Sequence, residues 1–267
     1  MNRADSMHLQ VLSSGSAGNS ALIRAGDTAV LVDAGLPLRD LELRLQHAGL
    51  GPWGLDHVFV THGHLDHARS AGSLSRRQDA LLHCCEALMR NASIRRSRRM
   101  ATLTVGRAQE VEGRRGSDGL RLTPVLLPHD AAPTVAFRIE QEGRTAVILT
   151  DMGRPCPEVA RRLGGAHVLV LEFNHDGELL EQGPYPYPLK RRILGDGGHL
   201  SNAQAAAMLR LLAGPELHTL VLAHLSRTNN RADLALESAR AELDHLGLAH
   251  VQVLVASQDE VGPNLAV

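Results

Sequence analysis

Three histidines and an aspartate lie within six consecutive positions of the chain, at His62, His64, Asp66 and His67. They follow the apolar run Val58-Phe59-Val60, which is typical of a buried strand. Neutral imidazole nitrogens and carboxylates are good ligands for zinc or manganese. Side chains alternate along an extended chain, so we expect His62 and His64 on one side, with Asp66 and His67 placed by the following turn. The segment predicts a metal site at a strand end, and its four ligands suggest two ions.

Single residues of the same kind follow three later apolar strands. His129, Asp151 and His224 each come directly after a predicted strand. One histidine in such a place is more often structural than a ligand. Three such residues, in this order after the first group, are predicted to complete the metal site.

The rest of the chain reads as a β-rich first part followed by alternating strands and helices. Strands are predicted over residues 8–12, 20–24, 29–32, 55–60, 120–127, 134–141, 145–150, 168–172, 219–223 and 251–255, and helices over 38–48, 158–163, 202–212 and 231–246. Gly26-Asp27 is predicted to be a hairpin turn. This order indicates stacked sheets with helices outside them. Since no repeat or linker separates two halves, we expect one domain over residues 1–267.

Composition narrows the protein class. No apolar run reaches the roughly 20 residues that span a bilayer, so we expect no membrane association. Met1–Ser6 lacks the apolar core of a signal peptide. The three cysteines are irregularly placed, which argues against a disulfide framework. We therefore expect a cytoplasmic protein of bacterial type; its oligomeric state stays open.

The segment from Arg69 to Arg121 is strongly basic. Its twelve arginines and five acidic residues give it a formal charge of +7, whereas the whole chain has a net charge of −1. The densest part is Arg95-Arg96-Ser97-Arg98-Arg99. A basic face on a near-neutral protein suggests a polyanionic partner. A solvated, arginine-rich surface explains the run equally well.

The ordered metal-ligand set resembles that of the metallo-β-lactamase-fold superfamily. Most of the chain, from about residue 13 to 230, resembles one branch of it, the YycJ/WalJ family of exonuclease-like hydrolases. The stretches that match are SGSAGNS, LVDAG, VTHGHLDH, LPHDAAPTVAF, TDMG, LEFNHD, GPYPYPLKRRILGDGGHLSN and AHLSRTNN. The resemblance implies an α+β fold, a four-layer αββα sandwich with two central mixed β-sheets flanked by helices. It also implies a DNA nuclease that degrades double-stranded DNA from 5′ to 3′.

The same resemblance assigns roles to the metal ligands. It implies two divalent metal ions per chain, zinc or manganese, which together activate a shared hydroxide. Asp66 would also orient that hydroxide, and Asp33 would support the histidines without binding metal. The first ion would be bound by His62, His64 and His129, the second by Asp66, His67 and His224, and both by Asp151.

A second resemblance concerns proton transfer. Glu172 and the later Gly198-His199-Leu200-Ser201 are similar to elements of tRNase Z and of the β-CASP nucleases. By this resemblance His199 is the general acid that protonates the leaving oxygen, and Glu172 is its partner. The chain has no inserted domain of the usual β-CASP size and no obvious tRNA-binding arm, which favours DNA over tRNA.

Several polar residues near these motifs are candidates for phosphate contact. The small-residue loop 14–20 can cradle an anion, although it can equally be a simple turn. Lys190 is the only lysine in the chain, which suggests a need for a compact ammonium group, unless its retention is chance. The helix predicted from residue 202 can attract phosphate at its N-terminus. The candidate substrate-binding residues are Ser14, Ser16, Asn19, Lys190, Ser201, Arg227, Asn229 and Asn230.

The sequence therefore predicts a two-metal phosphodiesterase that acts on nucleic acid, with double-stranded DNA as partner and substrate. A hydrolase of a small phosphodiester or a thioester is an alternative, as is a tRNase Z-like RNA nuclease. A non-catalytic binding protein is a third, which the complete ligand set disfavours. The shortage of aromatic residues argues against an extended base-stacking platform for single strands.

Overall fold

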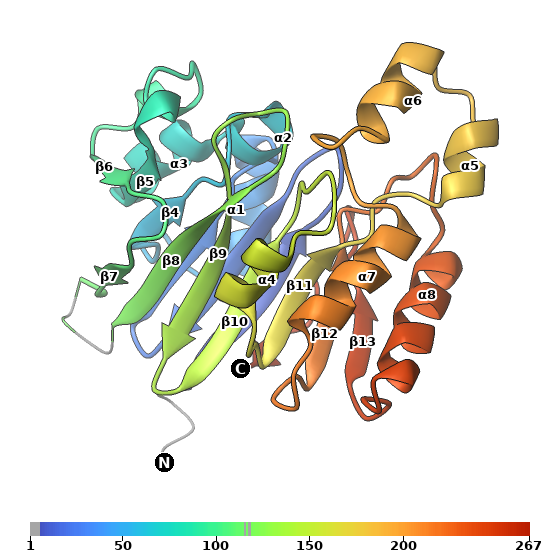
Figure 1. Cartoon of the computed structure of the whole chain (residues 1–267). Coiled ribbons are helices and arrows are strands. Elements are labelled where there is room, and N and C mark those ends of the chain that lie inside the picture. Colours follow the sequence, from blue (N-terminus) through green and yellow to red (C-terminus); the bar gives the residue numbers. More distant parts are fainter. Residues whose placement is uncertain (1–5, 115, 117–118) are drawn as a thin grey trace. The chain divides into compact units, whose positions relative to one another are not determined.

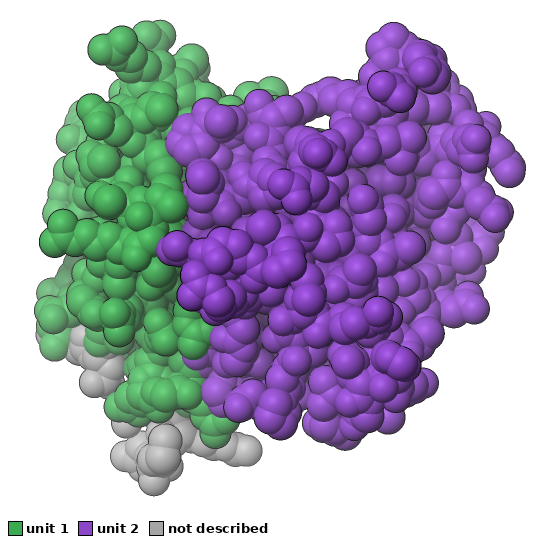
Figure 2. Space-filling view, in the orientation of Figure 1, with its two compact units in different colours: residues 1–124, 138–144, 257–267 green, residues 125–137, 145–256 purple. Residues whose placement is uncertain are grey.

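The computed structural model describes residues 6–114, 116 and 119–267. Met1–Asp5 of the N-terminal segment, and Arg115 and Asp118 of the basic segment, lie outside the described residues. The chain divides into two compact units (Figure 2). Unit 1 comprises Met1–Pro124, Arg138–Arg144 and Ser257–Val267, and unit 2 comprises Val125–Phe137 and Thr145–Ala256. The single domain over residues 1–267 stays a prediction.

The first sheet has seven strands within the described ranges, in the order β14-β1-β2-β3-β4-β5-β6. Strands β1 to β3 are antiparallel, and β3 to β6 are parallel. Residues 25 and 28 pair across the predicted hairpin turn, which is confirmed. The strands are β1 (His8–Ser13), β2 (Ser20–Ala25), β3 (Thr28–Val32), β4 (His57–Phe59), β5 (Leu81–Cys85), β6 (Met100–Leu103) and β14 (Leu265–Ala266).

The second sheet also has seven strands among the described residues, in the order β13-β12-β11-β10-β9-β8-β7. Strands β10 to β13 are parallel, and β7 pairs with β8 antiparallel. The strands are β7 (Gln109–Val111), β8 (Leu120–Leu127), β9 (Thr134–Gln141), β10 (Arg144–Leu149), β11 (Val168–Glu172), β12 (Thr219–Ala223) and β13 (Gln252–Val255). With the helices below, this confirms the predicted α+β class with two mixed sheets flanked by helices.

Helices of unit 2 bury apolar side chains against its parallel strands. Figure 1 shows α4, α7 and α8 over one face of β10 to β13. Met208 and Leu209 of α7 and Leu243 of α8 belong to the same buried core as Leu171 and Leu222 of the strands. Burying such side chains is the main favourable term that holds this layer on the sheet. The helices are α4 (Pro157–Leu163), α5 (Gly177–Gln182), α6 (Tyr187–Ile193), α7 (Asn202–Leu212) and α8 (Ala232–His245).

The basic region between β4 and β8 contains more regular structure than its sequence indicates. It holds α2 (Leu65–Ala68), α3 (Ala71–Gln78), two single 3₁₀ turns and β5 to β7. The helix before β4, α1 (Leu38–His47), was predicted correctly. The strands β6 and β7 are short, and exposed residues alternate with others along them, so they lack a continuous apolar run. No helix in the described part of the chain is both long and apolar enough to cross a membrane.

Parallel strands bring their carboxyl ends to one edge of a sheet, and this decides where the polar residues gather. In unit 2, Leu149 of β10 pairs with Leu171 of β11, which pairs with Leu222 of β12. Residues just beyond these positions therefore lie side by side. In unit 1, β3 and β4 likewise run parallel and end near one another. The register thus gathers polar residues at the strand ends of each unit.

A buried histidine in β5 gives the fold a sensitivity to acid. His83 is 3% exposed, and its ring stacks on Phe59 at 4.2 Å between centroids. Burial, and to a lesser degree the neighbouring His57, lowers the pKa of His83 from 6.5 to about 3. Between these two pH values the unfolded chain binds a proton that the folded chain excludes. Stability from this group is therefore complete above pH 6.5 and is lost as the pH falls.

We expect the free energy of unfolding to fall by about 1.4 kcal/mol per pH unit through this one group below pH 6.5. In a His83→Phe variant, the free energy of unfolding should be measured by urea denaturation at a series of pH values. We expect it to decline less steeply as the pH falls, by the slope that corresponds to about one bound proton. A decline equal to that of the parent protein would mean that His83 does not stay neutral in the folded state.

Candidate metal centre

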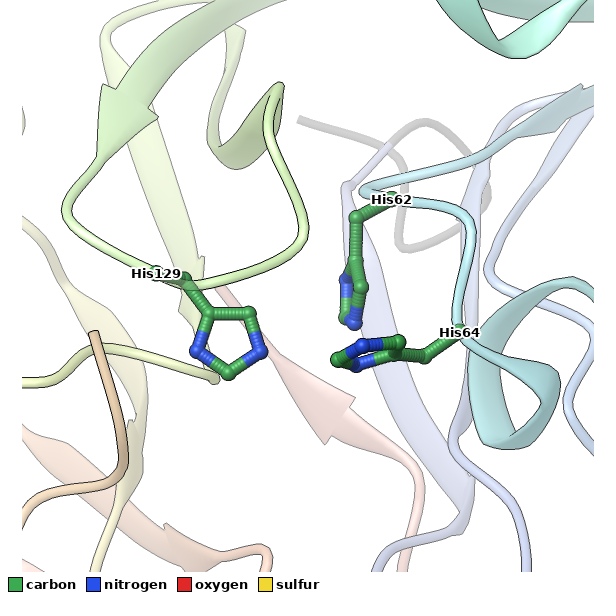
Figure 3. A group of neighbouring side chains, drawn as sticks. All are labelled: His62, His64 and His129. Atoms are coloured by element: carbon green, nitrogen blue, oxygen red, sulfur yellow. The ribbon is translucent and has the colours of Figure 1, made fainter. Parts of the chain in front are cut away.

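The first group of predicted ligands lies in unit 1, directly after β4. His62 and His64 extend from the loop after this strand (Figure 3), and Asp66 and His67 follow in α2. The rings of His62 and His64 are 4.8 Å apart between centroids, and those of His62 and His67 are 4.1 Å apart. His62 and His67 are fully buried, and the Asp66 carboxylate is partly exposed. The structure therefore brings the side chains of this segment together.

Asp33, at the end of β3, organises this group. One carboxylate oxygen accepts a hydrogen bond from the Thr61 backbone N–H at 2.8 Å. The other accepts from the Thr61 hydroxyl at 2.8 Å and lies 2.7 Å from His67 Nδ1. A proton on Nδ1 leaves Nε2 of His67 as the nitrogen with a lone pair for a metal. This geometry matches the supporting role expected for Asp33.

The small-residue loop before β2 packs against the same segment. The Asn19 backbone N–H donates to the Asp66 carbonyl at 2.8 Å, and the Asn19 side-chain nitrogen lies 3.0 Å from His67 Nε2. Gly35 allows this close approach, because a Cβ there would lie 1.7 Å from the Asp66 carbonyl oxygen. The loop therefore fixes the position of α2.

The second group of predicted ligands lies in unit 2, at its strand ends. His129 is on the loop after β8 (Figure 3), Asp151 follows β10 and His224 follows β12. All three are buried. His129 Nδ1 lies 3.0 Å from the Gly198 carbonyl oxygen, so it donates there and Nε2 keeps its lone pair. His224 Nδ1 and His129 Nε2 lie 3.5 and 4.0 Å from the same Asp151 oxygen.

Glu172, at the end of β11, is the centre of the network in unit 2. It is fully buried. Its Oε1 lies 2.8 Å from His199 Nδ1 and 3.0 Å from His224 Nδ1. Its Oε2 accepts hydrogen bonds from the backbone N–H groups of Met152 and Leu200, both at 3.1 Å. One carboxylate thus orients two imidazoles and two loops.

The charges in this network shift its pKa values in opposite directions. Burial alone would raise the pKa of Glu172, but the charge of His199 and hydrogen bonds from both histidines hold it below its usual range. Burial alone would lower the pKa of His199, but the charge and hydrogen bond of Glu172 and the charge of Asp151 raise it overall. The network therefore favours a negative Glu172 beside a histidine that holds its proton.

Three of the strand-end residues have left-handed backbone conformations. The φ angles are 62° at Asp33, 63° at Asp151 and 55° at His224. Such angles are uncommon outside glycine and cost free energy, although aspartate and histidine adopt them more readily than most residues. Each of these residues ends its strand with a sharp turn that sets the direction of its side chain.

Two candidates for substrate contact form hydrogen bonds within unit 2. Lys190 Nζ donates to the Glu181 carbonyl at 2.6 Å, which ties α6 to the end of α5. Ser201 is the N-cap of α7, where its hydroxyl accepts from the Gln204 N–H at 3.2 Å. Phosphate contact by either residue stays a prediction.

The other candidates differ in exposure. Ser16 and Arg227 are exposed, whereas Ser14, Asn19, Asn229 and Asn230 are buried. The Asn230 side chain forms a reciprocal amide pair with Asn202, at 2.9 and 3.0 Å, and donates to the Phe173 carbonyl. These contacts fold the loop after β12. Substrate binding by all six residues stays a prediction.

Three functional contacts were not anticipated from the sequence. Thr61 links Asp33 to His67 and lies 3.0 Å from His62 Nδ1, and its position next to the histidines was the only available signal. Glu172 contacts His224 as well as its expected partner His199. The Gly198 carbonyl accepts from His129 Nδ1. Because every residue has a backbone carbonyl, this contact could not be predicted from residue type.

The donor atoms in each unit suit divalent metal ions. In unit 2, one donor atom from each of Asp151, Glu172, His199 and His224 lies within 4.8 Å of the others. In unit 1, Asp33 holds Nδ1 of His67, so the nitrogen with a lone pair for a metal is Nε2, which lies 3.0 Å from the Asn19 side-chain nitrogen. Neutral imidazoles oriented by carboxylates and carbonyls, with carboxylate oxygens nearby, form the ligand set that zinc and manganese accept.

Known proteins share this chain's sequence pattern and fold. The sequence model of the metallo-beta-lactamase superfamily matches residues 14–224. The chain is 31% identical over 246 residues to the exodeoxyribonuclease YycJ of Bacillus anthracis, covering 90% of each protein. It is 33% identical over 228 residues to the exodeoxyribonuclease WalJ of Streptococcus pneumoniae serotype 2, covering 84% of each.

A solved structure agrees with the fold. The metallo-beta-lactamase fold protein YhfI from Bacillus subtilis aligns with a TM-score of 0.73 at 17% identity, covering 98% of this chain and 100% of that one. Fold and site thus define a metal-dependent hydrolase. The chain belongs to the metallo-beta-lactamase superfamily and, within it, to the YycJ/WalJ family.

Proposed function

We propose that the protein is a two-metal phosphodiesterase of nucleic acid, and more specifically a 5′-to-3′ exonuclease of double-stranded DNA. The 2.8 Å contact between Glu172 and His199 carries the proposal, because a protonated histidine suits departure of a nucleic-acid oxygen. The names of the exodeoxyribonuclease relatives support DNA as the substrate. Because such DNA lies in the cytoplasm of a bacterial cell, we expect the protein to act there.

The predicted ligands would hold two divalent ions, zinc or manganese. We assign His62, His64 and His129 to one ion, Asp66, His67 and His224 to the other, and Asp151 to both. When bound, the ions supply Lewis acidity for the phosphodiester and for the attacking water. The assignment rests on the order of these residues in the family pattern and on the orientation of their nitrogens within each unit.

His199 is positioned to deliver a proton to the leaving oxygen. Its Nδ1 is held by Glu172, so its Nε2 is the nitrogen that can reach a substrate. Its side chain is 19% exposed, whereas Glu172 is fully buried. A histidine whose proton is stabilised by a buried carboxylate can still release it once negative charge develops on the leaving oxygen. We assign His199 as general acid and Glu172 as the residue that orients it.

Asp66 is positioned to orient the attacking water. Its carboxylate is 22% exposed and lies 3.5 Å from His67 Nε2. A partly exposed carboxylate can accept a hydrogen bond from water and aim its lone pair at phosphorus. Removing this group should affect the chemical step more than the fold, because the Asp66 backbone, not its carboxylate, anchors the small-residue loop.

Phosphate contacts would hold the substrate without reading its sequence. The basic segment between Arg69 and Arg121 and the exposed Arg227 supply positive charge for this purpose. Backbone contacts position a nucleic acid but do not discriminate bases, which suits an enzyme that digests any DNA end.

The test is digestion of duplex DNA labelled at either end, with zinc, manganese or magnesium added to chelator-treated protein. We expect activity to disappear on chelation and to return with zinc or manganese, with the 5′-terminal nucleotide released first. Asp66→Ala should lower the rate to background while its thermal unfolding stays close to that of the parent.

Three further substrates separate the alternatives. A labelled tRNA precursor, a chromogenic phosphodiester and a thioester are tested under the same conditions. Cleavage of one of these, with DNA left intact under every metal, would show that the substrate assignment is wrong. The control for Asp66→Ala is Asp40→Asn, an exposed substitution on α1.

A further inference from the structure

The turn after β12 interrupts the hydrogen bonding between two neighbouring strands. Strands β11 and β12 pair in parallel up to Glu172 and Ala223, and the Phe173 backbone N–H still donates to the Ala223 carbonyl at 2.9 Å. The next residue of β12's chain, His224, has a φ angle of 55°, so the backbone leaves the extended conformation there. Phe173 and His224 are both buried. Their carbonyls need hydrogen-bond donors, because an unpaired carbonyl in the interior is costly.

The side-chain amides of two asparagines supply such donors. Asn174 Nδ2 donates to the His224 carbonyl at 2.9 Å, and Asn230 Nδ2 donates to the Phe173 carbonyl at 2.8 Å. Both asparagines are buried. A buried amide holds its carbonyl in one direction, since turning that carbonyl away would leave both groups unsatisfied. Asn174 therefore fixes the backbone of a residue that carries a predicted metal ligand.

The backbone of Asn174 is itself held on two sides. Its N–H donates to the carbonyl of Leu200, the neighbour of His199, at 3.1 Å. Its carbonyl accepts from the Ser226 N–H at 2.8 Å. One residue thus joins the end of β11 to the loop of the proposed general acid and to the loop after β12. A side chain that extends from such a fixed point can hold its partner to within the roughly 0.5 Å that a functional site requires.

The imidazole of His224 has a second restraint of a different kind. Its Nδ1 lies 3.0 Å from Glu172 Oε1 and 3.5 Å from an Asp151 oxygen. Glu172 therefore orients the ring, whereas Asn174 orients the main chain from which the ring extends. On a different backbone the ring could keep its contact with Glu172 while Nε2 moves. Both restraints together aim Nε2, the nitrogen that is left for a metal.

We propose that Asn174 is a positioning residue of the metal centre, which acts through the His224 carbonyl and not directly on a metal or a substrate. The proposal rests on the proposed function in one respect, namely that His224 binds one of the ions. Asparagine suits this task because its short side chain offers an N–H donor without a buried charge. An aspartate of the same shape would direct an oxygen at the carbonyl and lose the bond.

Metal-free protein gives the first test. The variant Asn174→Leu keeps the approximate shape of the side chain but removes the donor. A long-range proton–nitrogen NMR spectrum shows which ring nitrogen of His224 carries the proton. We expect Nδ1 in the parent, where Glu172 accepts from it, and a mixture of both tautomers in the variant, where the ring is no longer held in place.

Zinc affinity, measured by competition with a chromophoric chelator, gives the second test. We expect Asn174→Leu to bind zinc about tenfold more weakly, at the lower end of the effect of losing a partner of a metal-binding histidine. At saturating zinc, kcat on duplex DNA should fall by about tenfold and KM should change by less than about twofold, because the substrate does not touch Asn174.

The matched control removes a bond of the same kind elsewhere. Gln10 Nε2 donates to the Gly262 carbonyl at 2.9 Å, in unit 1. Gln10→Met should keep the parental tautomer, zinc affinity and kcat. If Asn174→Leu is unstable to heat, hydrogen exchange in the parent decides. Because coupling between two sites is reciprocal, zinc should slow exchange of the Asn174 side-chain amide by about the same tenfold and leave that of Gln10 unchanged.

Any one of three results would overturn the proposal. They are protonation of His224 on Nδ1 alone in the variant, parental zinc affinity in a folded variant, and amide exchange at Asn174 that zinc leaves unchanged. Each would reduce Asn174 to a purely structural role. The tautomer, affinity and exchange measurements contain no DNA. Failure to cleave DNA under any metal would therefore refute the proposed nuclease activity and leave the assignment of Asn174 standing.

Discussion

Glu172→Gln is expected to lower kcat on DNA by about a thousandfold, within the range of 10² to 10⁴ that general acid catalysis supplies. An amide places an NH₂ group where one carboxylate oxygen now accepts two hydrogen bonds. It therefore faces either the two histidine nitrogens or the two backbone N–H groups of Met152 and Leu200. In the first case His199 and His224 lose their orientation, and in the second the loops separate.

The same variant should lose about 3 kcal/mol of unfolding free energy, because buried donors are left without acceptors. Single-turnover rates and urea unfolding of the same preparations separate the two effects. Glu178→Gln, on the exposed face of α5, is the control and should match the parent in both. A Glu172→Gln protein with parental rate and stability would refute the role assigned to this carboxylate.

Asp33→Asn is expected to weaken binding of zinc by about 10- to 100-fold, the usual cost of losing a partner of a metal-binding histidine. Asparagine tolerates the left-handed backbone at this position, so the turn should survive. If the amide oxygen keeps the Thr61 N–H, its NH₂ group faces His67 Nδ1. Nδ1 of His67 must then accept a hydrogen bond from the amide. The imidazole proton therefore moves to Nε2, which is the atom needed for the metal.

Competition with a chromophoric chelator measures the affinity, and circular dichroism shows whether the fold is kept. Asp40→Asn, an exposed aspartate in the first turn of α1, is the matched control. Unchanged zinc affinity in a folded Asp33→Asn protein would mean that this aspartate supports the loop rather than the histidine tautomer.

The elements that the sequence predicted well are the ones buried as continuous apolar runs. Strands β3, β11 and β12 are buried at every residue. Strands β3 and β12 end where the apolar letters stop, and β11 ends one residue later, at Glu172. Strand β5 contains a buried histidine and two cysteines, and β6 and β7 are short and partly exposed. Their pairing in the sheets holds them in place, and pairing across a sheet is not a local property of the sequence.

The candidate site was predictable to the extent that its chemistry lies in side chains at strand ends. The contact between His129 and Gly198 joins residues 69 positions apart through a backbone carbonyl, which has no residue-type signal. Trp53 is a different case, because the Gly-Pro-Trp-Gly turn offers a glycine for the left-handed position and the structure uses the tryptophan instead. Such choices depend on the packing around the turn.

The two ligand groups differ in how far along the chain they reach. In unit 1, Asp33 and His67 lie 34 positions apart, so this group is complete early in synthesis. In unit 2, His224 contacts Glu172 from 52 positions further along, and β12 must join its sheet first. A growing chain therefore contains all the residues of the first group before His224 is available to contact Glu172. Under the proposed function, catalysis needs residues as far along the chain as His224, so it would begin only after that residue has been synthesised.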